Sequence, residues 1–295
     1  MSAVEQVAPL ADGIYPDMPR AAYDAIKDRA NYSSLKLMDV SPAHYRHGLD
    51  VGGRSDTKAL KVGRALHVAV FEPHLYDEEI VTWDGGDRKG KDWKAFAALN
   101  ARREILSLAE AADVRNMAAS VRSNPDAMRR LAAGEAEVTL LWTDPATGVR
   151  CKARLDWISA SGAIGDLKSA KDASPAAFGR QAYGLRYHVQ SAFYTDGLRV
   201  LTSEELPFEF YAVENSGPHT SQVYQVAEGD IAAGRRHYRE WLQQLVECRE
   251  ANRWPGYADH PLVLELPRWA DRAGAAFDAP DAFTTDEPND FTDDE

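Results

Sequence analysis

Residues 137–169 predict three consecutive β-strands joined by two tight turns, and this stretch constrains the fold more than any other part of the chain. Apolar residues alternate along the first strand until turn residues follow at 144–148. The second strand, residues 149–158, alternates strictly between apolar and polar side chains, which places the two kinds on opposite faces. Because residues 160–162 turn the chain again, the third strand, residues 163–169, returns beside the second.

The polar faces of these strands carry residues that suit phosphodiester chemistry. Asp156 lies on the second strand, and Asp166 and Lys168 share one face of the third. Two carboxylates across a hairpin can bind a hard divalent cation such as Mg²⁺, and a nearby lysine can lie beside a scissile phosphate. The alternative is a hairpin with solvated charges, because an isolated Asp-x-Lys sequence is common. The cations that precede Asp156 on its strand are Arg150, Lys152 and Arg154.

The composition is that of a globular protein with one large core or two modest ones. The sequence has no apolar run near the roughly 20 residues of a membrane helix and no secretory signal pattern at its start, so we expect a cytoplasmic protein without membrane contact. Cys151 and Cys248 are expected to be reduced core residues. Two cysteines are too few for a four-cysteine iron–sulfur cluster within one chain.

The net charge of −12 argues at first against nucleic acid as a partner. Residues 271–295, however, hold nine acidic residues and one arginine, a net charge of −8, which leaves −4 for the rest of the chain. We therefore expect residues 1–270 to fold as one domain that can carry a local basic patch. Residues 271–295 are expected to be a disordered acidic tail, which either serves solubility, competes with DNA or binds a basic partner.

Two further segments carry candidate site residues. The pattern of residues 57–71 predicts a helix in which His67 lies among apolar residues, either as a metal ligand or as an ordinary core histidine. Residues 84–93 form a glycine-rich basic loop that suits phosphate contacts or is simply solvated. The cations of that loop are Arg88, Lys89 and Lys91.

Helices are also predicted for residues 18–26, 92–108, 111–131, 174–200 and 228–252, and strands for residues 207–214 and 220–226. Serine 33 or 34 is expected to cap a short helix, and Ser41 precedes a proline at the first position of another. The helix at 174–200 has a core stripe and a second, aromatic and polar stripe, which suits the wall of a cleft or packing against another helix. The second stripe consists of Tyr183, Tyr187, Gln190 and Tyr194.

The ordered set of motifs resembles the PD-(D/E)xK nuclease superfamily and, within it, the RecE-type (exonuclease VIII-like) exodeoxyribonucleases of phages and prophages. The matching motifs are YSSLKLMDVSPAHY at 32–45, GRALHVAVFEP at 63–73, CKARLDW at 151–157, GDLKSAKDAS at 165–174, QSAFY at 190–194 and WPGY at 254–257. This resemblance implies an α/β fold with a central mixed β-sheet flanked by helices.

The resemblance also implies a role for each matching residue. Ligands of one or two Mg²⁺ or Mn²⁺ ions would be His67, Asp156, Asp166 and the backbone carbonyl of Leu167. Lys168 would be the catalytic lysine, and the helical pair near the nucleic acid would be Gln190 and Tyr194. Tyr187 and the cations named above are the expected DNA contacts. A further carboxylate, from Glu135 or Glu137, remains open because the strand face of each is ambiguous.

The activity that the resemblance implies is digestion of one strand of linear duplex DNA from a 5′ end, in recombination. It further implies a ring-shaped homo-oligomer and a single-strand annealing protein as partner. Two alternatives remain: an endonuclease or single-strand nuclease of the same superfamily, and a non-catalytic DNA-binding module on a nuclease fold. The intact Asp, Asp, Lys and His set argues against the last of these.

Overall fold

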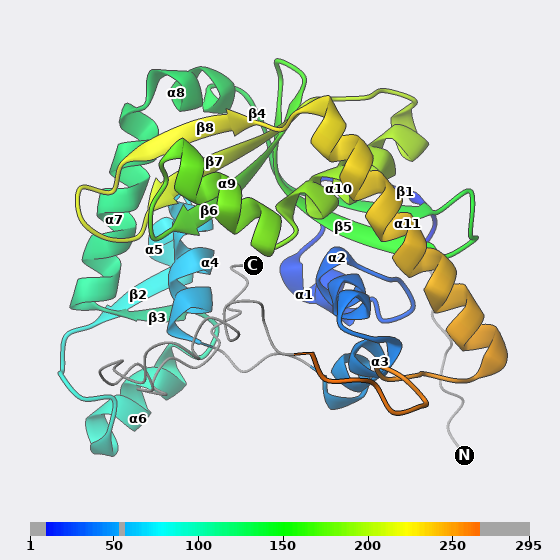
Figure 1. Cartoon of the computed structure of the whole chain (residues 1–295). Helices are drawn as coiled ribbons and strands as arrows, with labels where there is room; N and C mark the ends of the chain where they lie inside the picture. Colours follow the sequence, from blue (N-terminus) through cyan, green and yellow to red (C-terminus); the bar gives the residue numbers. More distant parts are fainter. Residues whose placement is uncertain (1–9, 53–56, 266–295) are drawn as a thin grey trace, which may run out of the picture.

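A six-stranded mixed sheet flanked by helices forms the centre of the molecule in a computed structural model that describes residues 10–52 and 57–265 (Figure 1). In this described part the strand order is β1-β4-β5-β6-β7-β8, with β6 and β7 parallel and the other neighbours antiparallel. The strands are β1 Gly13–Tyr15, β4 Gly134–Thr143, β5 Arg150–Ser159, β6 Ala163–Ala170, β7 Phe208–Glu214 and β8 Ser221–Gln225. The predicted α/β class and the predicted run of three strands are both confirmed.

Two apolar cores lie on opposite faces of this sheet. Phe210 on β7 belongs to the core under α10 and α11, whereas its neighbour Tyr211 belongs to the core under α4 and α7, as the strand period of two requires. The helices are α1 Arg20–Ala25, α2 Tyr32–Leu35, the 3-10 helix η1 Lys36–Asp39, α3 Pro42–Val51, α4 Lys58–Phe71, α5 Tyr76–Glu79, α6 Gly90–Leu99, α7 Leu108–Ser123, α8 Pro125–Leu131, α9 Pro175–Gly184, α10 Tyr187–Thr202 and α11 Glu228–Ala251.

Local side-chain caps determine where several helices begin. Ser41 accepts a hydrogen bond from the backbone N–H of His44 at the start of α3, as predicted from its proline. Thr57 does the same for α4. The cap predicted at serine 33 or 34 is wrong, because Asn31 accepts the bond from the N–H of Ser34 at 2.8 Å and α2 begins earlier.

A separate two-stranded parallel sheet, β2 Ile80–Trp83 with β3 Glu104–Ser107, was not predicted from the sequence. The single helix expected for residues 92–108 is therefore wrong in its second half, where α6 ends at Leu99 and β3 follows. Leu106 of β3 is fully buried. Pairing with β2, which lies on the other side of α6 in the sequence, overrides the local pattern.

The single helix predicted for residues 174–200 is two helices, α9 and α10, separated by Leu185 and Arg186. Arg186 adopts a left-handed backbone conformation with φ 63° and ψ 30°, which no continuous α-helix contains. The change of direction removes Tyr183 from the stripe on α10 and leaves its side chain 70% exposed.

Cys151 and Cys248 are buried and free, as expected. Among the described residues, no helix combines the length and apolar composition needed to cross a bilayer. The expected acidic tail, residues 271–295, lies outside the residues that the structure describes.

Candidate active site

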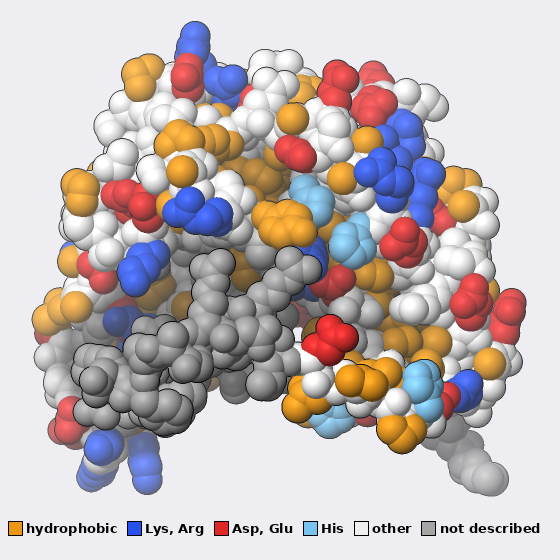
Figure 2. Space-filling view, in the orientation of Figure 1, with side chains coloured by type: hydrophobic (Ala, Val, Ile, Leu, Met, Phe, Trp, Pro, Cys, Tyr) orange, Lys and Arg blue, Asp and Glu red, His pale blue; other side chains and the backbone are white. Residues whose placement is uncertain are grey.

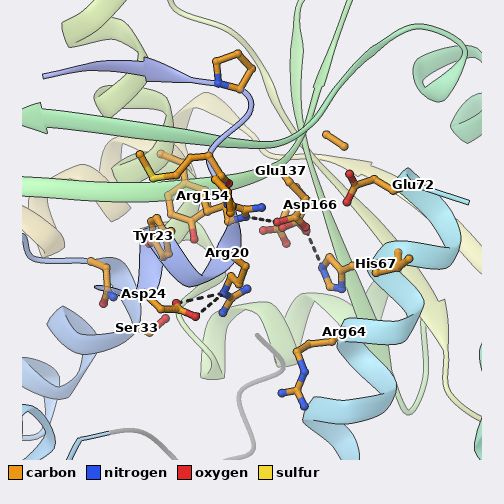
Figure 3. Close-up of a pocket in the computed structure, with 18 of the residues that line it drawn as sticks. Arg20, Tyr23, Asp24, Ser33, Arg64, His67, Glu72, Glu137, Arg154 and Asp166 are labelled. Carbon is orange, nitrogen blue, oxygen red and sulfur yellow. Dashed lines mark hydrogen bonds and ion pairs between the residues drawn. The ribbon is translucent and has the colours of Figure 1, made fainter. Parts of the chain in front are cut away.

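A cavity of about 580 Å³ opens beside the central sheet, with walls from the N-terminal segment, α1, α2, α4, β4, β5, β6 and α10 (Figure 3). Seven of the predicted site residues face this one cavity although they come from distant parts of the sequence. They are His67, Arg154, Asp156, Asp166, Lys168, Gln190 and Tyr194.

The two aspartates lie where β5 and β6 separate. The ladder between these strands ends at the pair Trp157 and Gly165, so Asp156 and Asp166 are the next residues on each strand. Beyond that point the backbone N–H of Leu167 donates to Asp156 Oδ2 at 2.9 Å. Diverging strands thus open room for two carboxylates while the backbone still fixes one of them.

His67 reaches Asp156 from α4 on the other wall of the cavity. Its Nε2 lies 2.9 Å from Asp156 Oδ2, and its Nδ1 lies 2.8 Å from the carbonyl oxygen of Gly63. Burial opposes the charged imidazole, but the charge and hydrogen bond of Asp156 outweigh it and raise the pKa of His67 to about 9. Burial likewise opposes the charged form of Asp156, yet His67 and then Lys168 lower the pKa of that carboxyl below its ordinary value.

Asp166 and Lys168 form a buried ion pair on β6. Lys168 Nζ lies 3.0 Å from Asp166 Oδ2, and each side chain is 2% exposed. Gln190 on α10 donates from Nε2 to Asp166 Oδ1 at 3.0 Å. The Tyr187 ring lies 4.8 Å from Lys168 Nζ, so an aromatic face borders the ammonium group.

Of the two candidate glutamates, Glu135 and Glu137, it is Glu137 on β4 that lies at the cavity with the aspartates. It lines the cavity, whereas Glu135 is exposed and lies outside the lining. Glu137 has φ 54°, which costs a non-glycine residue on the order of 1–3 kcal/mol, and its carboxylate pairs with Arg154. Strain of this kind is typical of functional sites.

Two of the predicted DNA contacts do not fit the structure. Lys152 is 4% exposed, and its ammonium group donates to the carbonyl oxygens of Tyr23 at 2.8 Å and Ile26 at 2.9 Å. The side chain therefore fastens the N-terminal segment to β5 instead of reaching a phosphate. Tyr187 is 2% exposed and packs against Lys168, so it supports the ion pair from inside.

The remaining predicted contacts are distributed over the surface. Arg88 is partly buried and pairs with Glu110 at 2.8 Å, whereas Lys89 and Lys91 are exposed. Arg150 pairs with Asp28 away from the cavity lining. Arg154 is the predicted strand cation that lines the cavity.

Further cavity residues were missed in the sequence. Arg20 and Asp24 of α1 pair with each other at 3.2 Å, and Arg64 lies one turn before His67 on α4 (Figure 3). Arg64 pairs with Glu104 at 2.6 Å. A helix partner three residues before a candidate ligand was a signal for Arg64, but Arg20 had none, because only the tertiary fold brings α1 to the cavity.

Comparison with known families identifies this arrangement. Residues 31–265 match the model of the family described as "PDDEXK-like domain of unknown function (DUF3799)". The chain belongs to this PDDEXK-like family. The resemblance to the PD-(D/E)xK superfamily is thereby confirmed. No curated protein sequence matches the chain.

A solved structure has a similar fold. A crystal structure of a protein from Eubacterium rectale, described as a candidate exonuclease, superposes with a TM-score of 0.61 at 16% identity. The match covers 88% of this chain and 99% of that one, and it supports the fold alone. The crystal structure of SSO0001 matches at 13% identity over 63% of this chain and 86% of that one, and its TM-score of 0.27 carries no argument.

The donor groups of this PDDEXK-like site suit a hard divalent cation. Asp156 and Asp166 face one cavity, and Mg²⁺ commonly uses one or two carboxylates while keeping several waters. Among the described residues, no three His, Cys, Asp or Glu side chains are gathered closely enough to hold an ion by themselves. The Nε2 atom of His67 is hydrogen-bonded to Asp156, so in this arrangement His67 positions that carboxylate.

Proposed function

We propose that this chain is a metal-dependent DNA nuclease that acts as an exonuclease on linear duplex DNA. The observation that carries the proposal is the meeting of Asp156, Asp166 and Lys168 at one cavity, where β5 and β6 separate in a PDDEXK-like chain. These groups are the ones that hydrolysis of a phosphodiester requires: carboxylates for a divalent cation and a fixed cation for the phosphate.

The chain's own residues have separate tasks in this proposal. Asp156 and Asp166 hold Mg²⁺ or Mn²⁺, one ion or two, and a bound ion supplies Lewis-acid polarisation and activates water for attack. Lys168 places positive charge beside the phosphate as negative charge accumulates on its oxygens. His67 and Leu167 orient Asp156, and Gln190 orients Asp166. The Leu167 carbonyl remains a proposed ligand.

The path of the DNA follows from charge in and around the cavity. Arg154, Arg64 and Arg20 line it, and each is positioned by an ion pair with an acidic residue. The exposed Lys89 and Lys91 are proposed to contact the phosphates of duplex DNA outside it. Tyr194 lines the cavity and is proposed to border the scissile nucleotide.

The finer proposal is an exonuclease of RecE type. On this basis we propose 5′ to 3′ digestion in recombination, a ring-shaped homo-oligomer and a single-strand annealing protein as partner. The support for this part is the resemblance of the sequence motifs together with the shared fold of the candidate exonuclease.

Incubation with end-labelled linear and closed circular duplex DNA, with Mg²⁺ or with EDTA, tests the activity. We expect loss of the linear DNA alone, only with Mg²⁺, and release of a 5′ label before a 3′ label. Opening of the circle would assign an endonuclease, and binding without cleavage would assign a DNA-binding module.

Variants locate the activity. Asp156→Asn and Lys168→Met should abolish cleavage. Asp172→Asn is the matched control, because Asp172 is an exposed carboxylate just beyond β6 and should keep wild-type activity. Cleavage that survives in Asp156→Asn would place the catalytic centre elsewhere.

A further inference from the structure

The turn between α9 and α10 presents an exposed aromatic side chain close to the cavity. Tyr183 lies at the end of α9 with 70% of its surface exposed, and the left-handed Arg186 begins the next helix. Tyr32 donates its hydroxyl to the carbonyl oxygens of Leu185 at 3.1 Å and Arg186 at 2.9 Å. The turn is therefore held by hydrogen bonds to α2.

Three side chains are grouped around the Tyr183 ring at this turn and are called here the aromatic platform: Tyr183, Arg186 and His188. The Tyr183 and His188 rings are nearly parallel, with an interplanar angle of 9° and centroids 5.9 Å apart. The Arg186 guanidinium lies 5.4 Å from the centroid of the Tyr183 ring. An exposed ring with a parallel aromatic partner and an adjacent cation is suited to stacking of another planar group.

The platform is supported by two neighbouring elements. Asp39 of η1 accepts from Arg186 Nε at 3.0 Å and lies 3.1 Å from Nε2 of His237 on α11. Burial, and then the neighbouring Arg186 and His237, lower the pKa of His188, which favours the neutral form of its ring. A neutral, fixed ring costs little conformational entropy when another ring stacks nearby.

The platform also lies next to the proposed catalytic groups. Tyr187 follows Arg186 directly, and its ring borders the ammonium group of Lys168. Figure 2 shows histidine side chains beside exposed hydrophobic atoms where α9, α10 and α11 meet. Tyr187 therefore connects the turn that carries the platform to the buried pair of Lys168 and Asp166 at the cavity.

We propose that the aromatic platform stacks an unpaired base of single-stranded DNA beside the cavity. This inference rests on the proposed nuclease function. It adds that the protein binds single-stranded DNA as well as the duplex substrate. Every base offers a π-face, so the contact is independent of sequence, while Arg186 adds a cation beside the stacked base.

Binding to two probes in EDTA tests the platform with the full chain. One probe is single-stranded oligothymidylate of about 12 nucleotides, and the other is an abasic chain of the same length. We expect the wild type to bind the thymidylate about 5- to 160-fold more tightly, since stacking contributes roughly that factor per base. Tyr183→Ala should remove the preference, and Tyr183→Phe should keep it.

Tyr257→Ala is the matched control, because Tyr257 is 77% exposed and also lies against a histidine, His44. Equal binding of the two probes by the wild type, or an unchanged preference in Tyr183→Ala, would overturn the proposal. A smaller species of Tyr183→Ala in sedimentation, with unchanged DNA preference, would assign the surface to self-association instead. The cleavage assay tests the nuclease proposal separately. If the protein cleaves DNA but does not prefer the thymidylate, only the platform proposal is refuted.

Discussion

Removal of Asp166 is expected to affect stability as well as cleavage, because Asp166 is half of a buried ion pair. The Asp166 and Lys168 side chains are each 2% exposed. Truncating one partner of such a pair typically costs about 3–5 kcal/mol, since the other charge stays in a poorly solvated site. Asp156 and the Tyr187 ring remain near Lys168 and offset part of that cost, so we expect about 3 kcal/mol for Asp166→Ala.

Thermal unfolding in EDTA measures this cost without a contribution from bound metal. A loss of about 3 kcal/mol lowers the melting temperature by roughly 6–12 °C for a chain of this size. The double variant Asp166→Ala/Lys168→Met removes both charges and should recover most of the stability while cleavage stays absent. If Asp166→Ala melts at the wild-type temperature, or the double variant is no more stable than the single one, the ion pair does not have the role inferred here.

Two other perturbations test the site and its support. In the metal-free protein, the pKa of His67 is raised from 6.5 to about 9 by its pair with Asp156. The pair therefore stabilises the fold fully below about pH 6.5, and this stabilisation is lost as the pH rises through about 9. The melting temperature of the wild type should therefore fall toward that of His67→Gln over this interval, and a constant difference would contradict the pair. Gly234→Ala should destabilise the protein, because its Cβ would lie 2.1 Å from the carbonyl oxygen of His188, whereas Gly179→Ala has open space and should be neutral or slightly stabilising. Equal chemical denaturation midpoints for these two glycine variants would refute the close contact of α10 and α11.

The sequence alone was sufficient for the hairpin strands and their aspartates. Alternation with a period of two and turn residues at fixed offsets are local properties, so β5 and β6 and the face shared by Asp166 and Lys168 follow from neighbouring residues. The family motifs placed His67, which is distant in the sequence, at the same cavity.

Other features depended on contacts between distant segments, which no local pattern encodes. Lys152 lies at a polar position of an alternating strand, which predicts a surface cation. It is nevertheless buried and donates to the carbonyl oxygens of Tyr23 and Ile26. β2 and β3 exist because they pair with each other across α6. The left-handed turn at Arg186 is held by Tyr32, more than 150 positions earlier. Periodicity predicts which face of an element is apolar, whereas the tertiary packing energy decides which partner covers that face and which charges remain in solvent.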